Sequence, residues 1–186
     1  MPPKARVTRQ MVLDAAFNVV KSKGYENLSV RNVADHLKCS TQPILYNYDG
    51  VEELREEVYK VAIKYHSLYI VAKKNEDKNT LISLGLNHVR FGYKEKNLFR
   101  FIFQSNKFGD EEIKSFLNNP EYAGMVEILS SGLKMDIVEA KEMFFAYLCT
   151  AHGIASFVSN DSVEYEEARY LKILEDAFYG MLALKK

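Results

Sequence analysis

The sequence predicts an all-α protein, and three observations support this fold class. Apolar residues recur at spacings of three and four along most of the chain, which is the repeat of an amphipathic helix. Glycine, proline and short polar runs divide these segments. The one stretch with alternating aromatic residues, 99–103, also fits a helical face, and the sequence offers no partner strand for it.

The composition is that of a globular protein and excludes several other classes. Apolar residues make up 47% of the sequence and charged residues 27%, which is typical of a folded domain. No run approaches the roughly 18–20 apolar residues of a membrane-spanning helix, and the charged residues 1–6 precede no stretch of the signal-peptide kind. Cys39 and Cys149 lie far apart and are expected to be reduced thiols. We therefore expect a cytoplasmic protein without a membrane partner.

Charge is distributed unevenly although the whole chain is neutral. Residues 1–48 contain seven cationic and three anionic side chains, a net charge of +4, so residues 49–186 carry −4. A basic segment attached to an acidic remainder is expected when only one end of a protein meets phosphate groups. Solvated surfaces also drift this far in charge, so the asymmetry supports nucleic-acid binding only together with other features.

Two helices are predicted near the N-terminus. Thr8 is placed to cap the first, and Gly24 is expected to end it because glycine adopts left-handed backbone angles without steric cost. Ser29 is placed to cap the second. The apolar faces comprise Val12, Leu13, Ala15, Ala16, Phe17, Val19 and Val20 in the first, and Val30, Val33, Ala34 and Leu37 in the second.

A third, short helix is predicted after a break at residues 38–39. Ser40 or Thr41 is expected to cap it. Pro43 fits its first turn, where the missing N–H has no intrahelical partner to lose. Three short helices whose last two are joined by a tight turn form a helix-turn-helix.

The third helix is expected to have an inner and an outer face. Ile44 and Tyr48 lie four residues apart and would pack on the first two helices. The side chains left facing outward are Thr41, Gln42, Leu45, Tyr46 and Asn47. In a major groove, such a face supplies hydrogen-bonding groups and apolar atoms for a thymine methyl, whereas on an ordinary surface it would be a solvated helix side.

The remaining sequence predicts a linking helix and a larger helical domain. Apolar spacing supports a helix over 51–73, which at about 1.5 Å per residue would span roughly 34 Å. Further helices are predicted at 80–94, 98–107, 111–118, 121–133, 136–159 and 164–184. The predicted organisation is a helix-turn-helix domain at 1–50, the linking helix 51–73, and a C-terminal helical domain at 74–186, with about nine to ten helices in all.

Residues 8–59 resemble the DNA-binding domain of TetR-type transcriptional regulators. The shared pattern is a capped helix ending in Gly-Tyr, then Ser-Val-Arg-Asn-Val-Ala, a recognition helix, and Glu-Glu-Leu at 52–54. The resemblance implies that the second helix meets the DNA backbone and that the third meets bases and sugar-phosphates. The candidate DNA-binding residues are Ser29, Arg31, Ser40, Thr41, Gln42, Pro43, Tyr46 and Asn47.

Two positions depart from the family pattern. Leu45 stands where an aromatic residue is usual, and Val51 where a lysine is usual. Both changes would weaken phosphate contacts. They would leave more of that role to Tyr46 and to a basic arm formed by Lys4, Arg6 and Arg9.

The C-terminal part resembles the family's regulatory domain in "FGYKEKNLFRFIF" and "AHGIAS". The resemblance implies a small-molecule effector and a homodimer formed through the two C-terminal helices. Candidate ligand-binding residues are Phe91, Phe103, Met125, Tyr147 and His152, although aromatic stripes are more often core. The apolar positions of the last two helices, assigned either to the core or to the dimer interface, are Met143, Phe144, Tyr147, Leu148, Ala151, Ala155, Val158, Leu171, Leu174, Ala177, Phe178 and Met181.

Two residues of the penultimate helix have a structural alternative. His152 is either a polar anchor for a ligand or a buried histidine with a local hydrogen bond. Gly153 is expected where two helices approach closely, because a glycine inside a helix costs roughly 1 kcal/mol relative to alanine.

The hypothesis that follows is a homodimeric, ligand-responsive, DNA-binding regulator, most simply a repressor of a near-palindromic operator. No cofactor is expected, and no metal site, because the histidines and cysteines lack ligand-type spacing. The alternatives are a helical ligand-binding or scaffold protein that has lost DNA binding, and a small all-α enzyme. No catalytic motif supports the enzyme.

Overall fold

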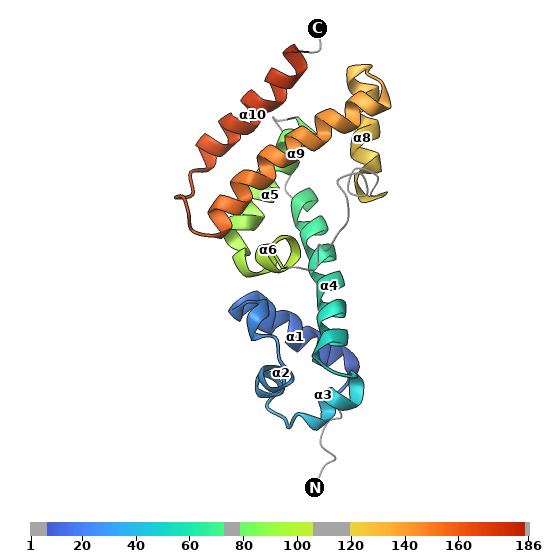
Figure 1. Cartoon of the computed structure of the whole chain (residues 1–186), viewed down its shortest axis with the longest axis vertical. Helices are drawn as coiled ribbons and strands as arrows, with labels where there is room; N and C mark the ends of the chain where they lie inside the picture. Colours follow the sequence, from blue (N-terminus) through green and yellow to red (C-terminus); the bar gives the residue numbers. More distant parts are fainter. Residues whose placement is uncertain (1–6, 73–78, 106–119, 185–186) are drawn as a thin grey trace. The chain divides into compact units, whose positions relative to one another are not determined.

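The computed structural model describes residues 7–72, 79–105 and 120–184, and every regular element in these ranges is helical (Figure 1). The elements are α1 Arg9–Lys23, the short 3-10 helix η1 Tyr25–Asn27, α2 Val30–Leu37, α3 Gln42–Asn47, α4 Val51–Ala72, α5 Thr80–Lys94, α6 Lys96–Phe103, α8 Pro120–Leu133, α9 Ile137–Ser159 and α10 Glu167–Ala183. The all-α prediction is confirmed. The helix predicted at 111–118 lies outside the described residues, and η1 was not predicted.

The first two helices begin where their sequence signals place them. The Thr8 hydroxyl accepts a hydrogen bond from the Met11 N–H, and the Ser29 hydroxyl accepts one from the Asn32 N–H, both at 3.2 Å. Gly24 ends α1 with a φ of +90°. These caps satisfy backbone groups that a helix end otherwise leaves without partners.

The start of α3 differs in one detail from the prediction. Thr41 occupies the capping position, but no side-chain hydrogen bond caps the helix. Pro43 follows two residues later and has no N–H to donate, and the Ile44 N–H donates instead to the Thr41 carbonyl at 3.1 Å. Thr41 also has helical backbone angles (φ −70°, ψ −19°), whereas a capping residue is usually extended.

The chain divides into two compact units, and each is described separately. The first consists of Met1–Leu68 and Glu95–Lys107, and the second of Tyr69–Lys94 and Phe108–Lys186. The first unit therefore includes α6, which the division of the sequence at residues 50 and 73 assigned to the C-terminal domain.

Aromatic packing explains why α6 belongs to the first unit. Phe101 of α6 is fully buried. Its ring stacks on that of Tyr25 with centroids 5.8 Å apart, and it meets the Tyr59 ring edge-on at 5.6 Å. Asn97 also donates from its side-chain amide to the Lys21 carbonyl at 3.0 Å. The core of the first unit thus depends on a segment that follows α5 in sequence.

The second unit is built around α5, which packs most extensively on α9 and also contacts α10. Two glycines of α5 allow this approach. A Cβ atom on Gly92 would lie 2.8 Å from the Ala155 carbonyl oxygen, and a Cβ on Gly85 would collide with the Tyr147 hydroxyl. At Gly92 the backbones of α5 and α9 therefore approach too closely for a side chain, whereas at Gly85 the Tyr147 side chain occupies the space.

Candidate nucleic-acid interface

The helix-turn-helix consists of α2, a short connection and α3. Lys38 ends α2 with left-handed backbone angles (φ 53°, ψ 44°), and the Cys39 N–H donates to the Ala34 carbonyl at 3.0 Å. This hydrogen bond closes the end of α2 in the manner of a left-handed C-terminal cap. The chain then turns within a few residues into α3.

The two faces of α3 are as predicted except at Asn47, which was expected to face outward and is half-buried. Ile44 and Tyr48 are buried. The opposite face carries Gln42, Leu45 and Tyr46, which share one side of the helix by their spacing of three and four residues. Leu45 is 54% exposed and Tyr46 75%. The buried face packs α3 against its own domain, and the exposed face can contact a partner molecule.

The other candidate DNA-binding residues are either exposed or partly engaged within the protein. Arg31, Ser40 and Thr41 are exposed, and Pro43 is half-buried. The Ser29 hydroxyl is already used as the cap of α2.

Asn47 is also used within the protein and is only half-buried. Its side-chain amide donates to the Pro43 carbonyl at 2.7 Å and to the Val7 carbonyl at 3.4 Å. These bonds take the donors that were expected to face DNA.

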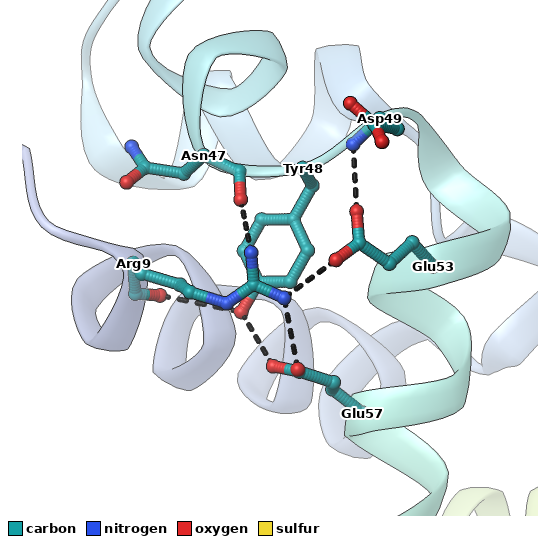
Figure 2. Close-up of polar contacts among 6 residues, drawn as sticks. All are labelled: Arg9, Asn47, Tyr48, Asp49, Glu53 and Glu57. Atoms are coloured by element: carbon teal, nitrogen blue, oxygen red, sulfur yellow. Dashed lines mark hydrogen bonds and ion pairs between the residues drawn. The ribbon is translucent and has the colours of Figure 1, made fainter.

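Arg9 has a role that the sequence did not reveal. Its guanidinium donates to the Asn47 carbonyl, to Glu53 at 2.6 Å and to Glu57 at 2.8 Å, and it lies over the Tyr48 ring at 3.9 Å from the centroid (Figure 2). These five residues form what we call the Arg9 cluster. Arg9 was expected to belong to a phosphate-binding arm together with Lys4 and Arg6, which lie outside the described residues. Two carboxylates engage it instead.

The Arg9 cluster shifts the titration of its members. The hydrogen bonds from Arg9 are the main reason that the pKa values of Glu53 and Glu57 lie below the ordinary value of 4.5. Burial, together with the hydrogen bond to Glu57, raises the pKa of Tyr48. Both carboxylates are therefore ionised, and the tyrosine is protonated, at neutral pH.

A second cation of the N-terminal segment is also paired. Lys21 lies 2.8 Å from Glu95 and donates to the Tyr65 hydroxyl at 2.9 Å. Burial lowers the pKa of Lys21, but the hydrogen bonds to Glu95 and Tyr65 outweigh it, so the pKa is raised. Among the described cations of residues 7–48, Lys23, Arg31 and Lys38 are exposed, and Arg9 is exposed too but is engaged by two carboxylates. The positive charge available to phosphate groups is therefore smaller than the net charge of +4 for residues 1–48 indicates.

The candidate ligand-binding residues do not all belong to one unit. Phe103 lies in the first unit, where its ring meets that of His66 edge-on at 5.1 Å. Phe91 of the second unit is fully buried, and Met125 of α8 is half-buried. Tyr147 is buried too, and its hydroxyl has no hydrogen-bond partner in the described part of the chain.

The structure distinguishes the two residues of α9 that had alternative interpretations. His152 Nδ1 lies 3.3 Å from His88 Nε2, which agrees with a histidine that makes a local hydrogen bond. Burial lowers the pKa of His152. A Cβ atom on Gly153 would meet nothing within 4 Å among the described residues, so no helix of the single chain makes the close approach that was predicted there.

Most residues considered for the dimer interface belong to the core of the second unit. The buried ones are Met143, Phe144, Tyr147, Ala151, Ala155, Val158, Leu174 and Phe178. Those of α9 face α5, α8 and α10, and Leu174 and Phe178 belong to α10, which packs on α5 and α9. The exposed large apolar side chains of the two helices are Ile137, Val138, Phe157, Ile173 and Tyr179.

No group of three or more His, Cys, Asp or Glu residues in the described ranges is placed to hold a metal ion. In the same part of the chain, no helix combines the length and apolarity needed to cross a membrane. Cys39 and Cys149 are free thiols.

Comparison with known proteins identifies the fold. No protein-family model matches the sequence, and no curated protein sequence does. A solved structure from Pseudomonas aeruginosa PAO1, described as a transcriptional regulator, matches with a TM-score of 0.66 and 13% identity over 94% of this chain and 90% of that one. A transcriptional regulator from Rhodococcus sp. Rha1 matches with a TM-score of 0.62 and 14% identity over 94% and 96% of the two chains.

A third solved structure carries a family name. It comes from Vibrio parahaemolyticus, is described as a TetR-family transcriptional regulator, and matches with a TM-score of 0.58 and 18% identity over 95% and 97% of the two chains. Because the sequence identities are this low, the likeness concerns the fold alone. The match extends over nearly the whole chain. The protein has the fold of the TetR-type transcriptional regulators.

Proposed function

We propose that the protein is a homodimeric, sequence-specific DNA-binding regulator of the cytoplasm, most simply a repressor released from its operator by a small molecule. The observation that carries this proposal is the exposed face of α3, formed by Gln42, Leu45 and Tyr46 above the buried Ile44 and Tyr48. A short helix with this arrangement in a helix-turn-helix is suited to enter a major groove. Arg31, Ser40 and Thr41 would add contacts from the connection and from α2.

A salt titration on duplex DNA tests the DNA-binding function. We expect the protein to bind a duplex from its own upstream region more tightly than a scrambled duplex. Its affinity should fall as salt rises, because each phosphate contact releases counterions and adds about −0.9 to the slope of log K against log[salt]. Fluorescence anisotropy at several salt concentrations measures both quantities. Equal affinity for the two duplexes, with no salt dependence, would contradict the proposal.

One alternative has specific support. Arg9 and Lys21 are paired with carboxylates, and Leu45 and Val51 stand where the family pattern has residues that contact phosphate. A helical ligand-binding protein that has lost DNA binding would have these features. The same titration separates the two functions, because this alternative predicts no binding at low salt.

The proposed homodimer uses the exposed apolar residues of α9 and α10. Phe157, Ile173 and Tyr179 are exposed in the described part of the second unit. No atom of the described residues would lie within 4 Å of a Cβ on Gly153 of α9, which would let a helix of a second copy approach there. Twofold-related α3 helices about 34–36 Å apart would enter successive major grooves of a near-palindromic site.

Replacing Phe157 by aspartate tests the dimer. Phe157 is 58% exposed in the single chain, so Phe157→Asp should leave the monomer fold intact and weaken the dimer about 100-fold, since a charge would be buried at the interface in both copies. Sedimentation equilibrium measures the change. Ile128→Asp on α8, where the isoleucine is 63% exposed, is the matched control and should leave the dimer unchanged. Equal behaviour of the two variants would exclude this interface.

The effector is proposed to bind in the second unit. Buried polar groups are normally hydrogen-bonded, and the hydroxyls of Tyr147 and Ser83 are buried without partners among the described residues. A polar group of a ligand could satisfy them, with His152 nearby in sequence on α9. Such a ligand would change the affinity of the protein for DNA only as far as its own affinities for the DNA-bound and the free conformation differ.

A further inference from the structure

α3 is too short to fix its own orientation. It has six residues, whereas an isolated helix needs about 12–15 residues to be even marginally stable in water. No side chain caps its N-terminus, and Tyr48 at its C-terminal end is extended (φ −142°, ψ 137°). The direction of the face formed by Gln42, Leu45 and Tyr46 therefore depends on contacts with neighbouring segments.

Arg9 makes such contacts at the C-terminal end of α3. Its guanidinium donates to the carbonyl of Asn47, the last residue of α3, and lies over the ring of Tyr48. The same group donates to Glu53 and Glu57, in the first two turns of α4. A single side chain from α1 thus joins the end of α3 to the start of α4 (Figure 2).

Further hydrogen bonds hold the two carboxylates in place. Glu57 accepts from the Tyr48 hydroxyl at 2.9 Å. Glu53 accepts from the backbone N–H of Asp49, in the turn between α3 and α4, at 2.7 Å. Both carboxylates that bind Arg9 therefore also accept a hydrogen bond from the α3–α4 junction, and removal of Arg9 would leave the two carboxylates facing each other.

The charge of the Arg9 cluster argues against a phosphate contact. One guanidinium faces two carboxylates, so the cluster is negative and would repel the DNA backbone. We propose that Arg9 is a positioning residue, which holds the DNA-reading face of α3 in a fixed orientation relative to α4. This inference rests on the DNA-binding function proposed above.

Two substitutions with opposite charge effects test the role of the cluster. Arg9→Gln removes a positive charge, and Glu57→Gln removes a negative one. If only electrostatics mattered, the first would weaken DNA binding and the second would strengthen it. Positioning predicts that both weaken binding to the selected duplex, by about tenfold if one base contact per site is lost, and that neither changes binding to a scrambled duplex. Stronger selective binding by Glu57→Gln would overturn the proposal.

The salt dependence supplies a second readout. Arg9→Gln should keep the slope of log K against log[salt], because no phosphate contact is lost. Arg31→Gln, at an exposed cation of α2, is the contrasting variant and should make the slope shallower by about 0.9 for each phosphate contact removed. A shallower slope for Arg9→Gln, with equal losses on both duplexes, would identify Arg9 as a phosphate contact instead.

Amide hydrogen exchange gives a readout that needs no DNA. The N–H groups of Leu45 and Tyr48 donate to the carbonyls of Thr41 and Ile44 within α3. Faster exchange of these two amides in Glu57→Gln would support the proposal, and unchanged exchange would overturn it. If Arg9→Gln does not fold, Tyr48→Phe replaces it as the second variant, with the same two outcomes. If the unchanged protein binds no duplex selectively, the proposed function fails, and exchange alone decides whether Arg9 orients α3.

Discussion

A protein carrying Gln42→Ala and Tyr46→Ala together should lose sequence-selective DNA binding while it keeps its fold. Both side chains project from the exposed face of α3, and Tyr46 is 75% exposed. A glutamine can form two hydrogen bonds with an adenine edge, and each such contact contributes about 1–3 kcal/mol to discrimination between bases. A twofold dimer loses every contact twice, so we expect selectivity to fall at least about 100-fold.

Binding to the upstream and scrambled duplexes, measured by anisotropy, quantifies this loss. Stability should change little, because exposed substitutions usually alter the free energy of unfolding by less than about 0.5 kcal/mol. Asn18→Ala, which removes an exposed amide in the middle of α1, is the control and should bind as the unchanged protein does. Retention of selectivity by the double variant would show that α3 is not the reading helix.

Gly92→Ala should destabilise the second unit strongly, although alanine is the better helix former. The added Cβ would lie 2.8 Å from the backbone oxygen of Ala155 and 3.2 Å from its Cα. A backbone atom cannot rotate away, so the two helices must separate, and overpacking of this kind typically costs about 1–3 kcal/mol. Gly85→Ala should be milder, since the nearest atoms belong to the movable end of the Tyr147 side chain.

Thermal and urea unfolding measure the effect of Gly92→Ala. The melting temperature should fall by about 2–4 °C for each kcal/mol lost in a chain of this size. Gly124→Ala is the matched control on α8 of the second unit, where a new Cβ meets nothing within 4 Å among the described residues, and helix propensity alone should stabilise the protein by up to about 1 kcal/mol. Similar changes in both variants would mean that α5 and α9 do not pack closely at Gly92.

Features encoded in neighbouring residues were predictable from sequence. The caps at Thr8 and Ser29, the end of α1 at Gly24, and the start of α3 around Pro43 each depend on a few adjacent positions. The two faces of α3 followed from the spacing of Ile44 and Tyr48, because a short amphipathic helix has only one way to bury them.

Features that depend on distant residues were not predictable. Arg9 and Glu57 are 48 positions apart, and a charge pattern gives no sign of which cation meets which carboxylate. The exposed and buried sides of α9 could not be distinguished either. Apolar residues such as Tyr147 and Phe157 occur around most of this helix, so spacing alone cannot tell which side faces α5.

The position of α6 in the first unit matters for recombination between proteins of this fold. A natural or engineered exchange that joins residues 1–72 to a foreign C-terminal domain would leave behind Phe101, whose ring fills the space between Tyr25 and Tyr59. The transferred N-terminal domain would then have an apolar cavity beside Tyr25 and Tyr59 unless the incoming domain supplies an equivalent aromatic residue. Hybrids that fold should therefore carry the segment Lys96–Phe103 together with the N-terminal helices, because these two segments belong to one unit although they are separate in the sequence.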